Sequence, residues 1–269
     1  MKRLRTIFAV CAAGLGMAGV AGVADASATI APPLQQSALE HALIAAHPYK
    51  TGSTEWELVT TSEALMGKSS SGFDGALFRA GDQYAFVFYG YNSRRDFGDV
   101  VRVGFVGVPR RQLREAEAFT EKAGASYGFD ASDAQFVGHS MGGYLAKAIG
   151  IHESAPEVWA FNSPGFKQRD PHRIEKLLGV GAGGDVPEIY NFNSQRDIVG
   201  LWGHQPGKVF EVETPQRHHT MAQMAAALGG EAVAEAPERR GPLKRMFNRI
   251  TGSTIVQKAL HNRFRAPGA

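Results

Sequence analysis

One serine in this sequence has the surroundings that a catalytic nucleophile requires. Gly138, Ser140 and Gly142 form a Gly-x-Ser-x-Gly pattern, which is typical of a serine on a sharp turn between a strand and a helix. The turn lifts the hydroxyl clear of the sheet, and small neighbours let the strand and the helix pass closely. Apolar residues precede Gly138, and small and aliphatic residues follow Met141. We therefore predict that Ser140 is a nucleophile rather than part of a structural turn.

A serine hydroxyl needs a histidine to accept its proton and a carboxylate to orient that histidine. In folds that use this turn, the acid and then the histidine follow the serine along the chain, each on a loop after a later strand. Asp197 meets this condition because it follows a predicted strand at residues 189–192, and Asp170 is the reserve acid. His219 directly precedes a predicted helix and is the favoured base, with its neighbour His218 as the reserve base.

Acyl transfer also needs N–H groups that bind the oxyanion. The backbone N–H of Met141 is the first expected donor, because it belongs to the residue after the nucleophile. The loop that follows the strand at residues 84–89 should supply the second donor, and the N–H of Tyr91 is the best placed. His139 should flank the serine rather than deprotonate it. This chemistry requires no metal and no organic cofactor.

The segments that would position these groups alternate between strand and helix. Predicted strands cover residues 75–80, 84–89, 100–108, 134–137, 158–161, 189–192 and 208–212. Predicted helices cover residues 34–46, 112–127, 144–151, 174–178 and 220–228, the first of them after a short linker at Pro32-Pro33. Such alternation indicates an α/β fold with a mainly parallel central sheet and helices on both faces.

The N-terminal residues carry a targeting signal. Residues 1–26 combine a basic start, an apolar stretch and small residues at Ala24 and Ala26, which predicts a cleaved secretory signal peptide and a periplasmic or extracellular location. The single cysteine, Cys11, lies within this segment. A mature chain without cysteine excludes disulfides, zinc-thiolate sites and a cysteine nucleophile. We find no later stretch long and apolar enough to span a bilayer.

Charge divides the rest of the chain in two. Of the 29 basic and 26 acidic residues, three basic and one acidic lie in residues 1–26, and eight basic and none acidic in residues 239–269. Residues 27–238, the predicted catalytic domain, therefore carry 18 basic and 25 acidic residues, a net charge of −7. The basic tail has amphipathic helical spacing, which suits contact with an anionic membrane surface or packing against the acidic domain. Nucleic acid is not expected as a partner.

Four ordered stretches of the sequence resemble the class 3 lipase branch of the α/β hydrolases. Residues 88–91 with 96–99 resemble that family's aromatic-Arg-Gly-Thr/Ser stretch and its following Asp-Trp and Asp. Residues 136–143 resemble its nucleophile elbow, residues 161–165 its next strand and turn, and residues 197–199 its Asp-x-Val acid segment. Two tyrosines depart from the pattern: Tyr89 replaces the usual Arg and Tyr91 the usual Thr or Ser. The backbone N–H of Tyr91 survives that change.

The resemblance implies a function. It suggests a secreted serine hydrolase that cleaves lipid carboxylic esters, as a lipase, phospholipase or esterase, through a Ser-His-Asp triad and an acyl-enzyme. Transfer of the acyl group to an acceptor other than water is a related possibility. The alternative from another class is a catalytically silent α/β-hydrolase domain that binds lipid or an envelope partner.

Overall fold

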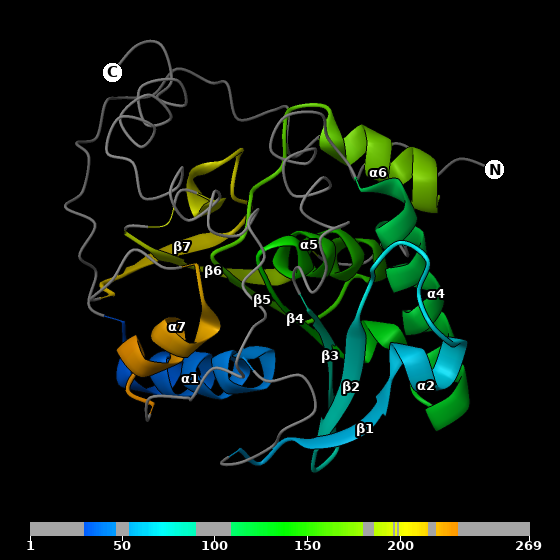
Figure 1. The fold of residues 1–269 in the computed structure, drawn as a ribbon, viewed down its shortest axis with the longest axis horizontal. Coiled ribbons are helices and arrows are strands. Elements are labelled where there is room, and N and C mark those ends of the chain that lie inside the picture. Colours follow the sequence, from blue (N-terminus) through cyan, green and yellow to red (C-terminus); the bar gives the residue numbers. More distant parts are fainter. Residues whose placement is uncertain are drawn as a thin grey trace.

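A seven-stranded sheet forms the centre of the computed structural model, which describes residues 30–46, 54–89, 109–179, 186–195, 197, 199–214 and 219–230. The strands lie side by side in chain order (Figure 1). They are β1 Glu57–Thr61, β2 Gly75–Ala80, β3 Gln83–Phe88, β4 Gln135–His139, β5 Glu157–Phe161, β6 Glu188–Ser194 and β7 Lys208–Val212. β1, β2 and β3 pair antiparallel, and every pairing from β3 to β7 is parallel. The predicted α/β fold with a mainly parallel sheet is confirmed.

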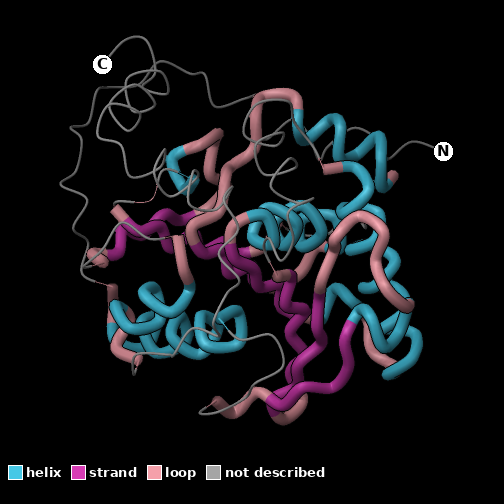
Figure 2. Tube along the Cα trace, viewed as in Figure 1, coloured by secondary structure: helices cyan, strands magenta, loops and turns pink. Residues whose placement is uncertain are grey.

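Helices cover both faces of this sheet (Figures 1 and 2). They are α1 Pro32–Ala46, α2 Ser62–Met66, α4 Arg110–Tyr127, α5 Met141–Glu153, α6 Asp170–Leu178 and α7 Met221–Ala227. Side chains alternate along β3: Phe86 and Phe88 face the core beneath α4 and α5, whereas Ala85 and Val87 face the core beneath α1 and α7. This alternation explains why β3 is apolar throughout, as expected of a strand buried on both faces.

The hairpin between β2 and β3 follows the sequence prediction. Ala80 pairs with Gln83, which leaves a two-residue turn at Gly81 and Asp82. Gly81 has φ +59°, a left-handed conformation that glycine adopts without a steric penalty. In contrast, β1 and α2 were not predicted, because β1 is a half-exposed edge strand without a clear apolar pattern.

Several boundaries differ from those predicted. The prediction of a linker at Pro32-Pro33 is wrong, since both residues belong to the first turn of α1. Proline is tolerated there because the N–H that it lacks would have no hydrogen-bond partner within the helix. The helix after the nucleophile turn begins at Met141 and ends at Glu153, longer than residues 144–151. The predicted signal peptide, the strand at residues 100–108 and the basic tail lie outside the described residues. Within the described ranges, the helices lack the combination of length and hydrophobicity that a membrane span requires.

Candidate active site

Ser140 occupies a strained turn between β4 and α5. Its backbone has φ +57° and ψ −124°, a region that L-residues with a side chain rarely adopt. The N–H of Ser140 donates to the carbonyl of Phe161 at 2.9 Å, which anchors the turn to the end of β5. The serine is 3% exposed. This conformation at the carboxyl end of a central strand is the geometry of a nucleophile elbow.

The glycines around Ser140 allow the close approach of strand and helix. A Cβ on Gly142 would lie 1.9 Å from the carbonyl oxygen of Phe88, and a Cβ on Gly138 would lie 2.3 Å from the backbone of Gly142. A Cβ on Gly143 would lie 2.6 Å from that of Ser163. The predicted need for small residues on both sides of the serine is confirmed, because backbone rather than side chain fills most of this space.

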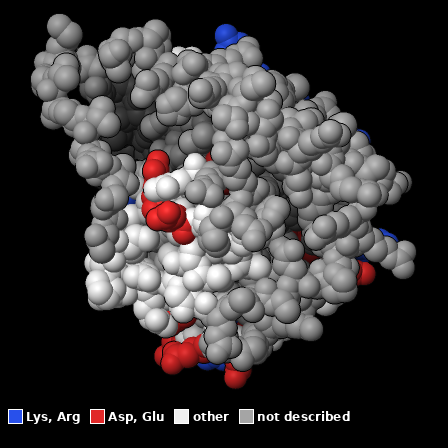
Figure 3. Space-filling model, turned by 60° about the vertical axis from the view of Figure 1, so that its left-hand side comes forward, with Lys and Arg blue, Asp and Glu red and all other residues white. Residues whose placement is uncertain are grey.

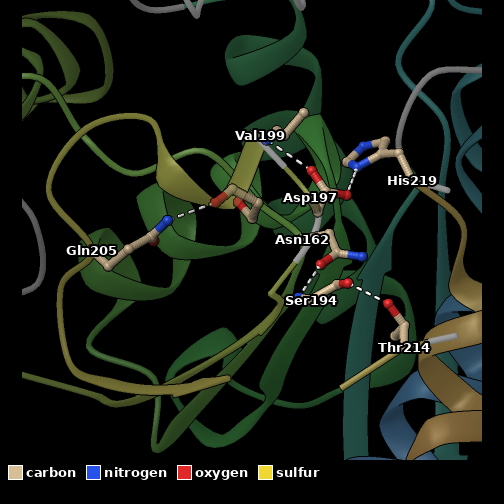
Figure 4. A network of polar contacts seen from close by, with 8 residues as sticks. Asn162, Ser194, Asp197, Val199, Gln205, Thr214 and His219 are labelled. Carbon is tan, nitrogen blue, oxygen red and sulfur yellow. Dashed lines mark hydrogen bonds and ion pairs between the residues drawn. The ribbon is translucent and has the colours of Figure 1, made fainter. Parts of the chain in front are cut away.

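Asp197 and His219 are joined by a hydrogen bond at the same edge of the sheet (Figure 4). The imidazole Nδ1–H of His219 donates to Asp197 Oδ2. The other carboxylate oxygen, Oδ1, accepts from the N–H of Val199 at 2.7 Å, at the start of a short 3-10 helix. Asp197 follows β6 and His219 precedes α7, so the two residues come from segments at the carboxyl ends of neighbouring parallel strands.

His139 connects this pair with the elbow. Its ring centroid lies 4.6 Å from that of His219, with an angle of 35° between the planes. Because His139 directly precedes Ser140, the contact brings the His219 imidazole to the nucleophile turn. The side chain of His219 is 15% exposed, so it is reachable from solvent and still shielded by the surrounding protein.

A second polar network supports the turn that carries Asp197 (Figure 4). Asn162 follows β5 with φ +44°, and its Oδ1 accepts from the N–H of Ser194 at 2.7 Å. The Ser194 hydroxyl in turn pairs with that of Thr214, and the Ser194 carbonyl accepts from the N–H of Asp197 at 3.0 Å. Sequence reasoning assigned no function to Asn162. The only available signal was its place in the stretch at residues 161–165.

Of the other predicted site residues, the structure describes Met141 and Asp170 but not Tyr91 and His218. Met141 is buried at the start of α5, and the residue after it, Gly142, lies against the end of β3. The reserve acid Asp170 lies away from this constellation, because its Oδ2 accepts from the Tyr144 hydroxyl at 3.1 Å and from the N–H of Lys167 at 2.9 Å. Tyr91 and His218 lie outside the described residues. Across the described ranges, no three His, Cys, Asp or Glu side chains converge as metal ligands would.

Several solved lipase structures are similar to this chain at low sequence identity. A fungal lipase in complex with an inhibitor is 12% identical, with 69% of this chain and 82% of that chain covered at a TM-score of 0.48. The Lip2 lipase from Yarrowia lipolytica is 14% identical, with coverages of 72% and 84% and a TM-score of 0.45. A triacylglycerol lipase from Penicillium expansum is 13% identical, with coverages of 78% and 93% and a TM-score of 0.46.

The comparison with protein families gives a match over most of the chain. No curated protein matches the sequence. The family model for the Tle-like phospholipase domain, described as phospholipase-like, matches residues 12–251. This range contains the elbow, the Asp197–His219 pair and all seven strands of the sheet. The chain therefore belongs to the family of Tle-like phospholipase domains and is a carboxylic ester hydrolase of the lipase type.

Proposed function

We propose that Ser140, His219 and Asp197 form the catalytic triad of this hydrolase, and that its substrates are lipid acyl esters. The observation that carries the proposal is the pair of contacts made by His219: a hydrogen bond to Asp197 on one side and ring contact with His139, the neighbour of Ser140, on the other. An imidazole held in this way presents Nε2 as the proton acceptor, since Nδ1 is already bonded to the carboxylate.

The proposed reaction proceeds through an acyl-enzyme. The Ser140 hydroxyl oxygen attacks the ester carbonyl carbon while His219 Nε2 accepts the hydroxyl proton. The C–O bond to the leaving alcohol then breaks, and the imidazolium gives its proton to that alcohol. A water molecule attacks the acyl-enzyme in the same way, which releases the fatty acid and restores Ser140. The N–H groups of Met141 and Tyr91 are the proposed oxyanion donors.

A fluorophosphonate probe tests the nucleophile. It should label the wild-type protein and fail to label Ser140→Ala. Ser163→Ala is a matched control, because Ser163 is also a buried serine and lies just after the end of the neighbouring central strand β5, and it should still be labelled. A folded wild-type protein that resists the probe would support the silent lipid-binding alternative instead.

A panel of p-nitrophenyl esters and phospholipids tests the substrate class. We expect hydrolysis of lipid esters, with release of free fatty acid. His219→Ala should abolish turnover while His218→Ala should retain it. The opposite result would assign the base to His218. Formation of a new acyl ester in place of free fatty acid would identify the enzyme as an acyltransferase.

We further propose export through residues 1–26 and membrane contact through residues 239–269. The domain carries excess negative charge, and exposed acidic residues such as Glu211 and Glu213 belong to the β7 edge; Figure 3 shows a group of acidic side chains on the face where this edge comes forward. Such a surface is repelled by anionic lipid, so the basic tail is the part of the chain suited to that contact.

Two experiments test these assignments. N-terminal sequencing of the exported protein should find Ser27 as the first residue, and retention of residue 12, where the family match begins, would contradict cleavage after Ala26. Deletion of residues 239–269 should weaken binding to anionic liposomes and spare hydrolysis of a short soluble ester. Unchanged liposome binding would favour a tail that packs against the acidic domain.

A further inference from the structure

The helix that follows the proposed nucleophile contains a buried lysine, Lys147, which has no carboxylate partner among the described residues. Lys147 lies in α5, seven residues after Ser140, and is 0% exposed. Its Nζ donates to three uncharged acceptors: the carbonyl of Pro164 at 3.0 Å, Asn191 Oδ1 at 3.3 Å and Gln205 Oε1 at 2.6 Å. Burial lowers the pKa of Lys147 to about 7, which reflects the cost of holding a cation in this place.

The surrounding amides are oriented so that their oxygens face this lysine. The Nδ2 of Asn191 donates to the carbonyls of Pro206 at 2.6 Å and Lys208 at 3.2 Å. The Nε2 of Gln205 donates to the carbonyls of Ser163 at 2.7 Å and Gly200 at 2.9 Å. Neither amide can turn its nitrogen toward Lys147 without losing two hydrogen bonds. Three fixed acceptors match the three donors of an ammonium group.

This arrangement connects Lys147 to the turn that carries Asp197. Gln205 binds Lys147 through its oxygen and the Gly200 carbonyl through its nitrogen, and Gly200 follows Val199, whose N–H donates to Asp197 (Figure 4). The loops after β5 and β6 are further joined by paired backbone hydrogen bonds between Phe166 and His204, both 2.8 Å long. The ammonium therefore lies where these two loops meet.

We propose that Lys147 is a positioning residue for the reaction: through Gln205, its ammonium fixes the loop that holds Asp197 against His219. The inference rests on the proposed triad. A lysine needed only for packing would be replaceable by a hydrophobic side chain of similar length, because a buried charge is costly to desolvate. A positioning lysine is not replaceable in this way, since its three donors hold two loops together.

Two substitutions separate these cases. Lys147→Met keeps the length of the side chain and removes the donors. Gln205→Glu leaves Lys147 a partner but removes the N–H donors to Gly200 and Ser163. Each should lower kcat by about 10- to 100-fold and change KM by less than about threefold, because the ester-binding surface is untouched.

Tyr144→Phe is the matched control. The substitution removes a buried hydrogen bond that the same helix makes to Asp170, and not to the loop that carries Asp197. The variant should therefore retain kcat within about twofold of wild type. Wild-type kcat in Lys147→Met, with or without a lower Tm, would overturn the positioning assignment. So would a Gln205→Glu variant as active as wild type.

A spectroscopic measurement keeps the inference separate from the proposed function. The proton in the His219–Asp197 hydrogen bond should give a low-field NMR resonance in the wild type, absent from Asp197→Ala. Lys147→Met should shift or broaden this resonance, and Tyr144→Phe should not. If the wild type hydrolyses no ester, the proposed function fails, yet this resonance still decides whether Lys147 positions Asp197. An unchanged resonance in Lys147→Met would show that it does not.

Discussion

The imidazole rings of His139 and His219 lie 4.6 Å apart and 35° from parallel, so the residue before the proposed nucleophile packs against the proposed base. The hydrogen bond to Asp197 holds the Nδ1 side of the His219 ring. The ring of His139 restricts rotation about that bond. Together the two contacts fix the plane of the imidazole whose Nε2 is the proton acceptor in the proposed triad.

We therefore expect kcat to depend on the aromatic ring of His139 more than on its two nitrogens. His139→Ala should lower kcat by about tenfold, because the His219 ring gains freedom to leave the reactive orientation. His139→Phe keeps an aromatic ring in the same place and should stay within about threefold of wild type. Steady-state kinetics on a short soluble ester measures both. Equal losses in the two variants would instead assign the effect to a hydrogen bond of His139.

Substitution of Asp197 by asparagine should lower kcat without preventing folding. Asp197→Asn retains an oxygen that can accept from the N–H of Val199, so the variant should fold. Its amide cannot stabilise the imidazolium of His219, and we expect kcat to fall by about 10³- to 10⁴-fold. Single-turnover and steady-state kinetics would give this loss.

Asp170→Asn provides the comparison. Asp170 is fully buried and accepts from the Tyr144 hydroxyl and the N–H of Lys167, so its replacement should lower Tm and leave kcat within about tenfold of wild type. If Asp170→Asn were folded but inactive and Asp197→Asn were active, Asp170 would be the catalytic acid and Asp197 the structural carboxylate.

Gly142→Ala tests the packing of the elbow through stability. Alanine is favoured over glycine in a helix by about 1 kcal/mol, which alone predicts a more stable protein. The new Cβ would lie 1.9 Å from the carbonyl oxygen of Phe88, so α5 and β3 must separate, at a cost of about 2–4 kcal/mol. We expect net destabilisation in urea unfolding.

Gly128→Ala is the control for backbone strain alone. Gly128 ends α4 in the left-handed conformation, with φ +74°, ψ +37° and open space around a Cβ, so alanine there should cost only about 1–2 kcal/mol. A Gly142→Ala protein as stable as the wild type would show that the strand and the helix can move apart freely, contrary to the close packing described above.

The sequence predicted those parts of the fold and site that have a local steric or chemical signature. The elbow is of this kind, because Ser140 needs small neighbours in the chain itself. β7 was predicted at its observed bounds, and Asp197 from its place after β6. Asn162 and Lys147 were not identified, since their partners lie more than ten residues away and none of them is required by the chemistry of ester hydrolysis.

The edge strand β1 was also not predicted from the sequence. β1 has an exposed and half-exposed pattern, and only its pairing with β2 makes it a strand. Propensity and periodicity cannot reveal an element whose stability comes from a tertiary contact.

His41 lies in α1, on the opposite face of the sheet from α5. Its burial should make the free energy of unfolding depend on pH. His41 is 4% exposed, its ring stacks on Trp159 at 4.4 Å, and its nitrogens lie 2.7 Å from the Ser37 carbonyl and 2.6 Å from Gln135 Oε1. Burial lowers the pKa of His41 below its ordinary value of 6.5, against the raising effect of those two hydrogen bonds. Folding therefore favours the neutral ring.

The sign of the pH effect follows from that preference. As pH falls below about 6.5, the unfolded chain binds a proton at His41 that the folded chain does not, so the free energy of unfolding decreases. His41→Phe keeps a ring on Trp159 and removes this titration. Between pH 7 and pH 5 its free energy of unfolding should fall less steeply than that of wild type, by up to about 1.4 kcal/mol per pH unit. Urea unfolding at several pH values measures the two slopes. A slope in His41→Phe as steep as that of the wild type would contradict the assignment.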